Sequence, residues 1–108
     1  MRLLLSPLLV GTALLSTLSL PAHANQQLAQ SKACMACHQV DKKLVGPAYK
    51  DVAAKYKGDK TALAKLTAKV KNGGSGVWGP VPMPANAAVS DADLKTVVEW
   101  VLAGAPAK

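Results

Sequence analysis

Two cysteines and a histidine stand within five positions of one another, in the stretch KACMACHQV at residues 32–40. Cys34 and Cys37 are the two cysteines of the chain, and His38 directly follows the second. Residues of these types can close a disulfide, bind a metal, exchange thiols or hold a haem through two thioether bonds. These chemistries belong to different classes of protein, so the rest of the sequence has to distinguish among them.

Three of these interpretations lack residues or elements that they need. A thioredoxin-like pair starts a helix beside a β-sheet, but no strand pattern precedes Cys34. A structural zinc site takes four ligands, and beyond residue 24 the chain offers Cys34, Cys37 and His38. A disulfide between residues three apart closes a tiny loop and gives His38 no role. Cys-x-x-Cys-His therefore predicts covalent attachment of one haem c, with its iron, through both cysteines.

The spacing also suits an iron with one ligand on each face of the haem. Residues at i and i+3 of a helical turn lie about 5–6 Å apart, so both sulfurs reach one porphyrin and His38 is carried to the iron. Beyond residue 24 there is no second histidine, and Met35 is held between the two anchoring cysteines. Met83, in GPVPMP at residues 79–84, is the remaining soft donor. We predict His38 and Met83 as the metal ligands; the alternative for Met83 is a core filler.

Residues 1–24 have the pattern of a signal peptide that is cleaved on export. Arg2 precedes an apolar run that reaches Leu20, and AHA at residues 22–24 is a small-x-small cleavage site. An uncleaved membrane anchor is the alternative, because the run is nearly long enough to span a bilayer. The cleavage site favours removal, so we expect a mature chain of residues 25–108 that forms one domain without stable membrane insertion.

The mature chain is basic and has few large apolar side chains. The sequence has 13 Lys and Arg against 6 Asp and Glu, so loss of Arg2 leaves a net charge of +6. This balance favours acidic partners or a solubilising surface; nucleic acid is not expected for an exported protein whose lysines are spread along the chain. Six leucines, four aromatics, no isoleucine and no phenylalanine make a thin core. A large cofactor would supply the apolar volume that is missing.

Apolar periodicity predicts an all-α domain of four helices. A short helix covers about residues 25–33, and a second follows Gly46-Pro47 and ends near Gly58. Its apolar stripe is formed by Tyr49, Val52, Ala53 and Tyr56.

The two later helices have clearer ends. Asp59 is the expected N-cap of a third helix that stops at residues 72–74. Ser90 and Asp93 make a capping box for a fourth helix, which ends before Gly104. The apolar face of that helix is formed by Leu94, Val97, Val98, Val101 and Leu102. Between them, residues 73–89 form a loop rich in glycine and proline, and a loop of that length in a compact domain indicates a function.

Three segments resemble the small bacterial cytochrome c-551 group of class I cytochromes c: CMACH at residues 34–38, VGPAYKDVA at residues 45–53 and GVWGPVPMPAN at residues 76–86. The resemblance extends over nearly the whole mature chain. It implies a four-helix class I cytochrome c fold around one haem, with the first and last helices crossing. It also implies a monomeric electron carrier of the periplasm that is not an enzyme.

The resemblance implies roles for three further cofactor-binding residues. Pro47 would offer its carbonyl oxygen to the outer ring nitrogen of His38. Asn86 would donate to the sulfur of Met83, and Trp78 would direct its indole N–H to a haem propionate. The simpler alternatives are a helix start for Pro47, a turn for Asn86 and a core position for Trp78.

The function implied is the shuttling of single electrons between respiratory redox proteins. Nitrite reductase, a terminal oxidase, a peroxidase and a quinol-oxidising cytochrome complex are the implied partners. Lys32, Lys42 and Lys43 are candidates for guiding their acidic surfaces, and Lys69 stands where the family often has an arginine near the propionates. The alternative is a sensor or peroxidase-like protein with five-coordinate haem iron, in which Met83 leaves the iron open.

Overall fold

The computed structural model describes residues 10–13 and 24–107. Most of the predicted signal peptide lies outside these residues, so its cleavage stays a prediction. The helices are α1 (Ala24–Ser31), α2 (Tyr49–Lys55), α3 (Ala62–Asn72) and α4 (Asp91–Leu102), with a 3₁₀ turn, η1 (Cys34–Ala36), after α1. The described residues form no strand, which confirms the predicted all-α class. None of the helices described in residues 10–13 and 24–107 is both long and apolar enough to cross a membrane.

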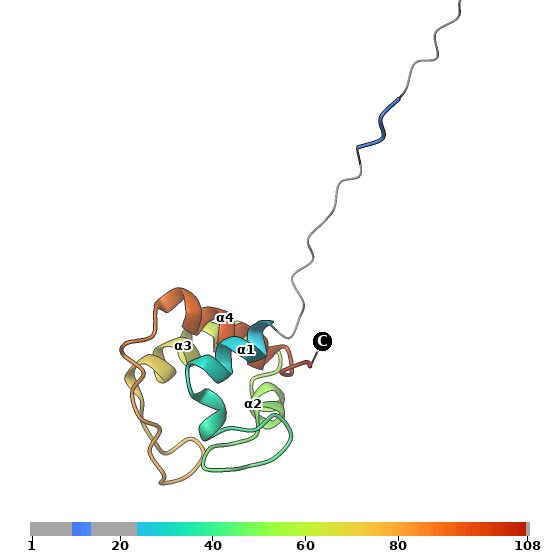
Figure 1. Ribbon diagram of the computed structural model, residues 1–108. Coiled ribbons are helices and arrows are strands. Elements are labelled where there is room, and N and C mark those ends of the chain that lie inside the picture. The colour runs from blue at the N-terminus through green and yellow to red at the C-terminus, as the bar shows by residue number, and fades with distance from the viewer. Residues whose placement is uncertain (1–9, 14–23, 108) are drawn as a thin grey trace, which may run out of the picture.

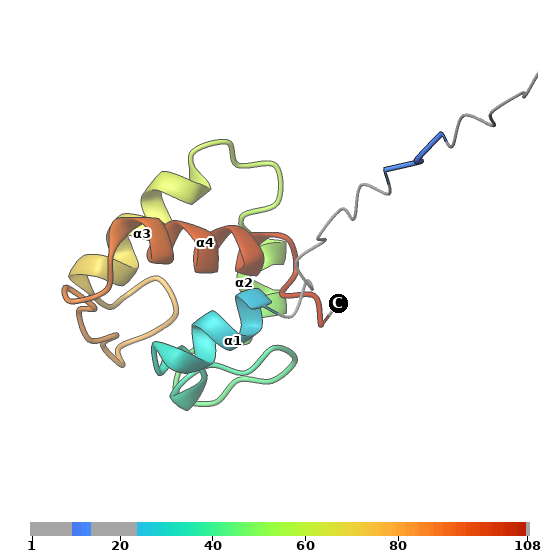
Figure 2. The same cartoon turned by 45° about the horizontal axis from the view of Figure 1, so that its top comes forward.

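Helix α4 lies at the centre of the domain and packs against α1, α2 and α3 (Figures 1 and 2). Four residues of the predicted apolar face of α4 are buried, Leu94, Val97, Val98 and Val101, and the fifth, Leu102, is half-buried. Trp100, which the predicted face did not include, is also buried, and its indole N–H donates to the carbonyl oxygen of Pro106 at 3.0 Å. The main core cluster consists of Ala29, Tyr49, Val52, Val97, Trp100, Val101 and Ala105.

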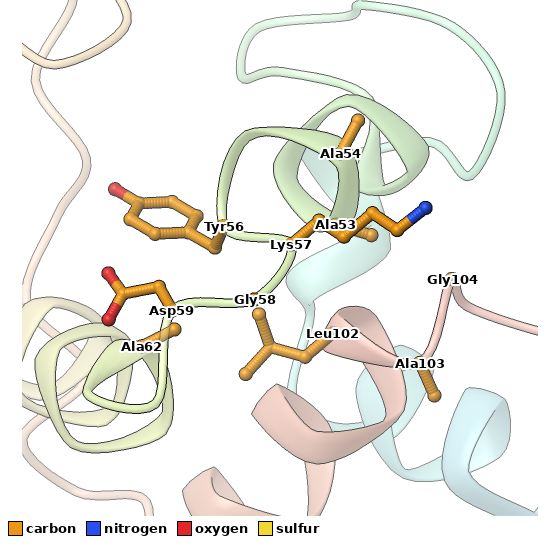
Figure 3. A pocket seen from close by; sticks show the side chains of 10 residues that line it. All are labelled: Ala53, Ala54, Tyr56, Lys57, Gly58, Asp59, Ala62, Leu102, Ala103 and Gly104. Carbon is orange, nitrogen blue, oxygen red and sulfur yellow. The ribbon is translucent and has the colours of Figure 1, made fainter.

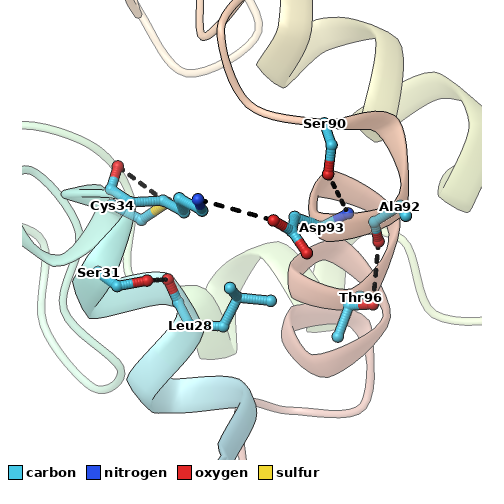
Figure 4. A network of polar contacts seen from close by, with 8 residues as sticks. Leu28, Ser31, Cys34, Ser90, Ala92, Asp93 and Thr96 are labelled. Atoms are coloured by element: carbon cyan, nitrogen blue, oxygen red, sulfur yellow. Dashed lines mark hydrogen bonds and ion pairs between the residues drawn. The ribbon is translucent and has the colours of Figure 1, made fainter.

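The start of α4 has half of the predicted capping box. Ser90 Oγ accepts a hydrogen bond from the backbone N–H of Asp93 at 3.2 Å, as predicted. The Asp93 carboxylate does not reach back to Ser90; its Oδ2 atom lies 3.6 Å from Lys32 Nζ (Figure 4). This ion pair ties the segment just before the cysteines to the first turn of α4.

The predicted N-cap of α3 is wrong by two residues. The helix begins at Ala62 with Thr61 as its N-cap. Asp59 Oδ1 instead accepts hydrogen bonds from the backbone N–H of Thr61 at 2.8 Å and from its hydroxyl at 2.6 Å. These hydrogen bonds hold the pKa of Asp59 below its usual value. Asp59 therefore closes the turn that precedes the helix, a competing use of the same side-chain oxygen.

Two loops extend from the helices on the side away from α4 in Figure 1. One comprises residues 38–48, between η1 and α2, and the other comprises residues 73–90, between α3 and α4. Ala33 has φ 61°, a left-handed conformation that is costly for alanine and that separates α1 from η1. This break in the helix lets the cysteine turn face the space between the two loops.

Candidate haem site

A cleft of about 430 Å³ lies among the two loops, α2, α3 and α4. Cavities of this size commonly hold small molecules and cofactors. Its walls are mainly apolar and include Val52, Leu66, Val97, Val98 and Val101. Six of the seven predicted cofactor-binding residues line it: Cys34, Cys37, His38, Pro47, Trp78 and Met83. The seventh, Asn86, is not among its lining residues.

Both cysteines open onto this cleft without being joined to each other. The turn is held by backbone hydrogen bonds from the N–H groups of Cys37 and His38 to the carbonyl oxygen of Cys34, at 3.3 and 3.1 Å. Burial raises the pKa of the Cys34 thiol above its usual value, so the thiol stays protonated near neutral pH.

The described residues contain no group of three or more His, Cys, Asp or Glu side chains placed to hold a metal ion. A structural zinc site of the usual kind needs four such ligands.

The imidazole of His38 is fixed in one orientation. Its Nδ1 atom lies 2.8 Å from the carbonyl oxygen of Pro47, at the place predicted for this bond. Because a carbonyl oxygen only accepts, Nδ1 carries the proton, and the lone pair of Nε2 is left to bind a metal. The ring also stacks on Tyr49, with 5.0 Å between centroids and 17° between planes.

Gly46 makes room for this imidazole, a role that the sequence analysis missed. A Cβ atom at residue 46 would lie 2.4 Å from Cε1, 2.8 Å from Nδ1 and 3.0 Å from Nε2 of His38. A Cβ atom does not tolerate non-bonded contacts this short, so the ring of His38 occupies the space that a side chain at residue 46 would need. The dipeptide Gly46-Pro47 therefore supplies both the space for His38 and its hydrogen-bond acceptor.

Met83 reaches the cleft from the second loop. Its backbone pairs with Gly74 through two hydrogen bonds, N–H of Met83 to O of Gly74 at 2.8 Å and the reverse at 3.0 Å. Met35 is not among the lining residues and packs beside the core cluster instead. Of the two methionines in residues 24–107, Met83 is thus the one placed to meet a group bound in the cleft.

Comparison with known proteins agrees with this site. The protein-family model described as Cytochrome c matches residues 22–105. The chain belongs to the cytochrome c family. It is 52% identical to cytochrome c-551 of Pseudomonas aeruginosa over 99 residues, which is 92% of each chain. It is 57% identical to cytochrome c-552 of Hydrogenobacter thermophilus over 79 residues, which is 73% of this chain and 80% of that one. The crystal structure of Nitrosomonas europaea cytochrome c552 superposes with a TM-score of 0.71 at 52% identity, covering 73% of this chain and 98% of that one.

Membership confirms the predicted class I cytochrome c fold and the covalently bound haem c with its iron. The residues that line the cleft also suit a haem c, independently of the family comparison. Two cysteines and the imidazole of His38, held through its Nδ1 atom by Pro47, line the cleft, and most of the remaining wall is apolar. As a cytochrome c related to cytochromes c-551 and c-552, the protein is an electron carrier.

The two other predicted residues of this cytochrome c have contacts of their own. Asn86 Nδ2 donates to the carbonyl oxygens of Val70 and Pro84, both at 3.2 Å, so it fastens the end of the loop to the last turn of α3. Trp78 is 42% exposed and lies beneath the ammonium of Lys55. The contacts of Asn86 with the Met83 sulfur and of Trp78 with a propionate stay predictions.

A second hollow, of about 460 Å³, lies between the end of α2 and the end of α4 (Figure 3). It is wide open and lined largely by alanine and glycine. The side chains of Lys57 and Asp59 extend away from each other in Figure 3, so its charged groups do not converge on one point. The haem chemistry of this cytochrome c belongs to the first cleft.

Proposed function

We propose that this cytochrome c is exported to the periplasm and carries single electrons with His38 and Met83 as the two axial ligands of its haem iron. The observation that carries the proposal is the hydrogen bond from Nδ1 of His38 to Pro47, 2.8 Å long, in the same cleft as Met83. It leaves Nε2 of His38 as the ligand atom, and the two ligands come from different loops. The haem iron supplies one-electron Fe(III)/Fe(II) chemistry when bound.

The chain's own residues keep both ligands in place during electron transfer. Pro47 holds Nδ1 of the imidazole, Gly46 packs against the ring, and the ring of Tyr49 stacks on it. The paired backbones of Gly74 and Met83 set the direction from which the thioether enters. A site with both ligands fixed reorganises little, and it leaves no open position for oxygen or peroxide.

The exposed lysines near the site give the proposed partners an electrostatic target. Lys43 lines the cleft, and neither Lys42 nor Lys43 forms an ion pair with a described carboxylate. Lys32 is neutralised in part by Asp93, so we assign the guiding role to Lys42 and Lys43. The partners are redox proteins with acidic docking surfaces, such as a nitrite reductase or a quinol-oxidising cytochrome complex.

The visible spectrum of the purified ferric protein tests the ligation. We expect a low-spin spectrum with the weak far-red band of iron bound by methionine sulfur, and we expect Met83→Ala to lose that band and become high-spin. Met35→Ala is the matched control, because Met35 lies away from the cleft, and it should retain the band. A high-spin spectrum in the unaltered protein would reject the proposal in favour of the five-coordinate sensor or peroxidase-like alternative.

A further inference from the structure

Lys55 contacts the loop that carries Met83. Its ammonium nitrogen lies over the face of the Trp78 ring, 5.4 Å from the ring centroid. Attraction between a cation and the face of an indole extends to about 6 Å, and tryptophan is the strongest aromatic partner. Lys55 belongs to the last turn of α2, whereas Trp78 belongs to the loop after α3. The contact therefore joins two segments that are separate in the sequence.

Lys55 makes this contact in preference to a local ion pair. Asp51 precedes it by four residues on the same helix, the spacing and order that favour an acid–base pair. The five ion pairs of the described residues nevertheless leave Lys55 out and use Lys32, Lys50, Lys65, Lys71 and Lys95. Among the described residues, the ammonium of Lys55 thus contacts the Trp78 indole and forms no ion pair.

Residues 76–79, the tip of the loop between α3 and α4, have few other attachments. Its base is fixed by the Gly74–Met83 backbone pair and by the bond from the Asn86 N–H to the carbonyl oxygen of Val70, 3.1 Å long. Between those points, the described backbone hydrogen bonds include one within the loop, from Gly76 N–H to the carbonyl oxygen of Gly79 at 2.8 Å, and none to a helix. Trp78 lies inside that turn, so the contact of its ring with Lys55 also holds the tip of the loop.

We propose that Lys55 is a positioning residue that holds the Trp78 ring at the edge of the cleft and thereby fastens the methionine loop to α2. Trp78 is 42% exposed and lines the cleft. The cation over its face fixes the plane of the ring and the direction of the indole N–H. The part of the inference that concerns Met83 rests on the proposed function; the part that concerns the Trp78 ring does not.

Exchange of the indole N–H with water, followed by NMR on the haem-loaded protein, tests the contact directly. Lys55→Gln removes the cation, and we expect exchange at Trp78 to be about two- to fivefold faster. Lys55→Arg keeps a cation that stacks on indole and should restore the slow rate. Lys57→Gln is the control, because it removes the same charge from a lysine that lines the other hollow. The Trp100 N–H, bonded to Pro106, is the internal reference.

The effect on Met83 is measured by the rate at which the ferric protein binds added imidazole, which requires the loop to open. We expect Lys55→Gln to bind imidazole about two- to fivefold faster than the unaltered protein, and Lys55→Arg and Lys57→Gln to match it. Equal indole exchange in Lys55→Gln and Lys57→Gln would overturn the role of Lys55. Immediate imidazole binding by the unaltered protein, without the far-red band, would instead overturn methionine ligation, and indole exchange would still decide the role of Lys55.

Discussion

Gly46→Ala is the sharpest test of how the imidazole is held. The new Cβ atom would lie 2.4 Å from Cε1 of His38, whereas carbon atoms in contact stand about 3.5–4.0 Å apart. The ring or the backbone must therefore move by about 1 Å. A shift of that size breaks the 2.8 Å hydrogen bond between His38 and Pro47, which tolerates little lengthening.

The cost follows from these two effects. Overpacking of a tight site costs about 1–3 kcal/mol, and a lost hydrogen bond costs about 0.5–1.5 kcal/mol. We expect the free energy of unfolding of the haem-loaded protein to fall by about 2–4 kcal/mol. For a domain of this size, each kcal/mol lowers the melting temperature by about 4–8 °C, so the drop should be about 8–32 °C.

Thermal unfolding and the visible spectrum of the ferric protein measure the two consequences together. Gly58→Ala is the matched control: its Cβ meets no atom within 4 Å, although its φ of 79° is unfavourable for alanine. It should lose about 1–2 kcal/mol of stability and keep the spectrum unchanged. If Gly46→Ala lost no more stability than Gly58→Ala and kept the far-red band, the close packing of residue 46 against the imidazole would be refuted.

Three further changes test other parts of the structure. Ser90→Ala removes the cap of α4 and should lower the free energy of unfolding by about 1 kcal/mol in urea titrations. Thr96→Ala, which deletes a half-buried hydroxyl later in the same helix, is the control and should lose less. Asp59 has a lowered pKa, so its contribution to stability is present above pH 3.8 and is lost as the pH falls through its folded-state pKa. Asp59→Asn should therefore make the free energy of unfolding depend less on pH in this acid range, and an unchanged dependence would contradict the argument. Lys43 lines the cleft, so Lys43→Gln should slow electron transfer to ferricyanide at low salt more than Lys60→Gln does. Equal rates in the two variants, or a rate that does not change with ionic strength, would reject steering by Lys43.

Much of the haem site could be predicted because its chemistry is local in the sequence. Cys34, Cys37 and His38 lie on one turn, and the acceptor at Pro47 is nine residues from the histidine. The attachment motif alone carries this information, and the resemblance to class I cytochromes c added the acceptor. The structure places all four residues on one cleft.

The features that were missed depend on contacts between distant segments. Gly46 reads as an ordinary turn residue, and nothing in its type shows that an imidazole lies against it. Lys55 reads as an exposed helix end, since the position of the Trp78 ring is set by the loop after α3. The N-cap of α3 failed for a different reason: Asp59 and Thr61 are both good capping residues, and the sequence does not say which turn the Asp59 oxygen will close.

Tyr49 shows why the orientation of the iron ligand depends on the helices as well as on the loop. Its ring stacks on His38 and meets Trp100 edge to face, with 5.5 Å between centroids and 77° between planes. Trp100 in turn is buried in α4 and bonded to Pro106. The imidazole is therefore part of one packed aromatic row that ends in the central helix. A change in the packing of α2 against α4 would turn this row and reach His38, even where it left the cysteine turn untouched.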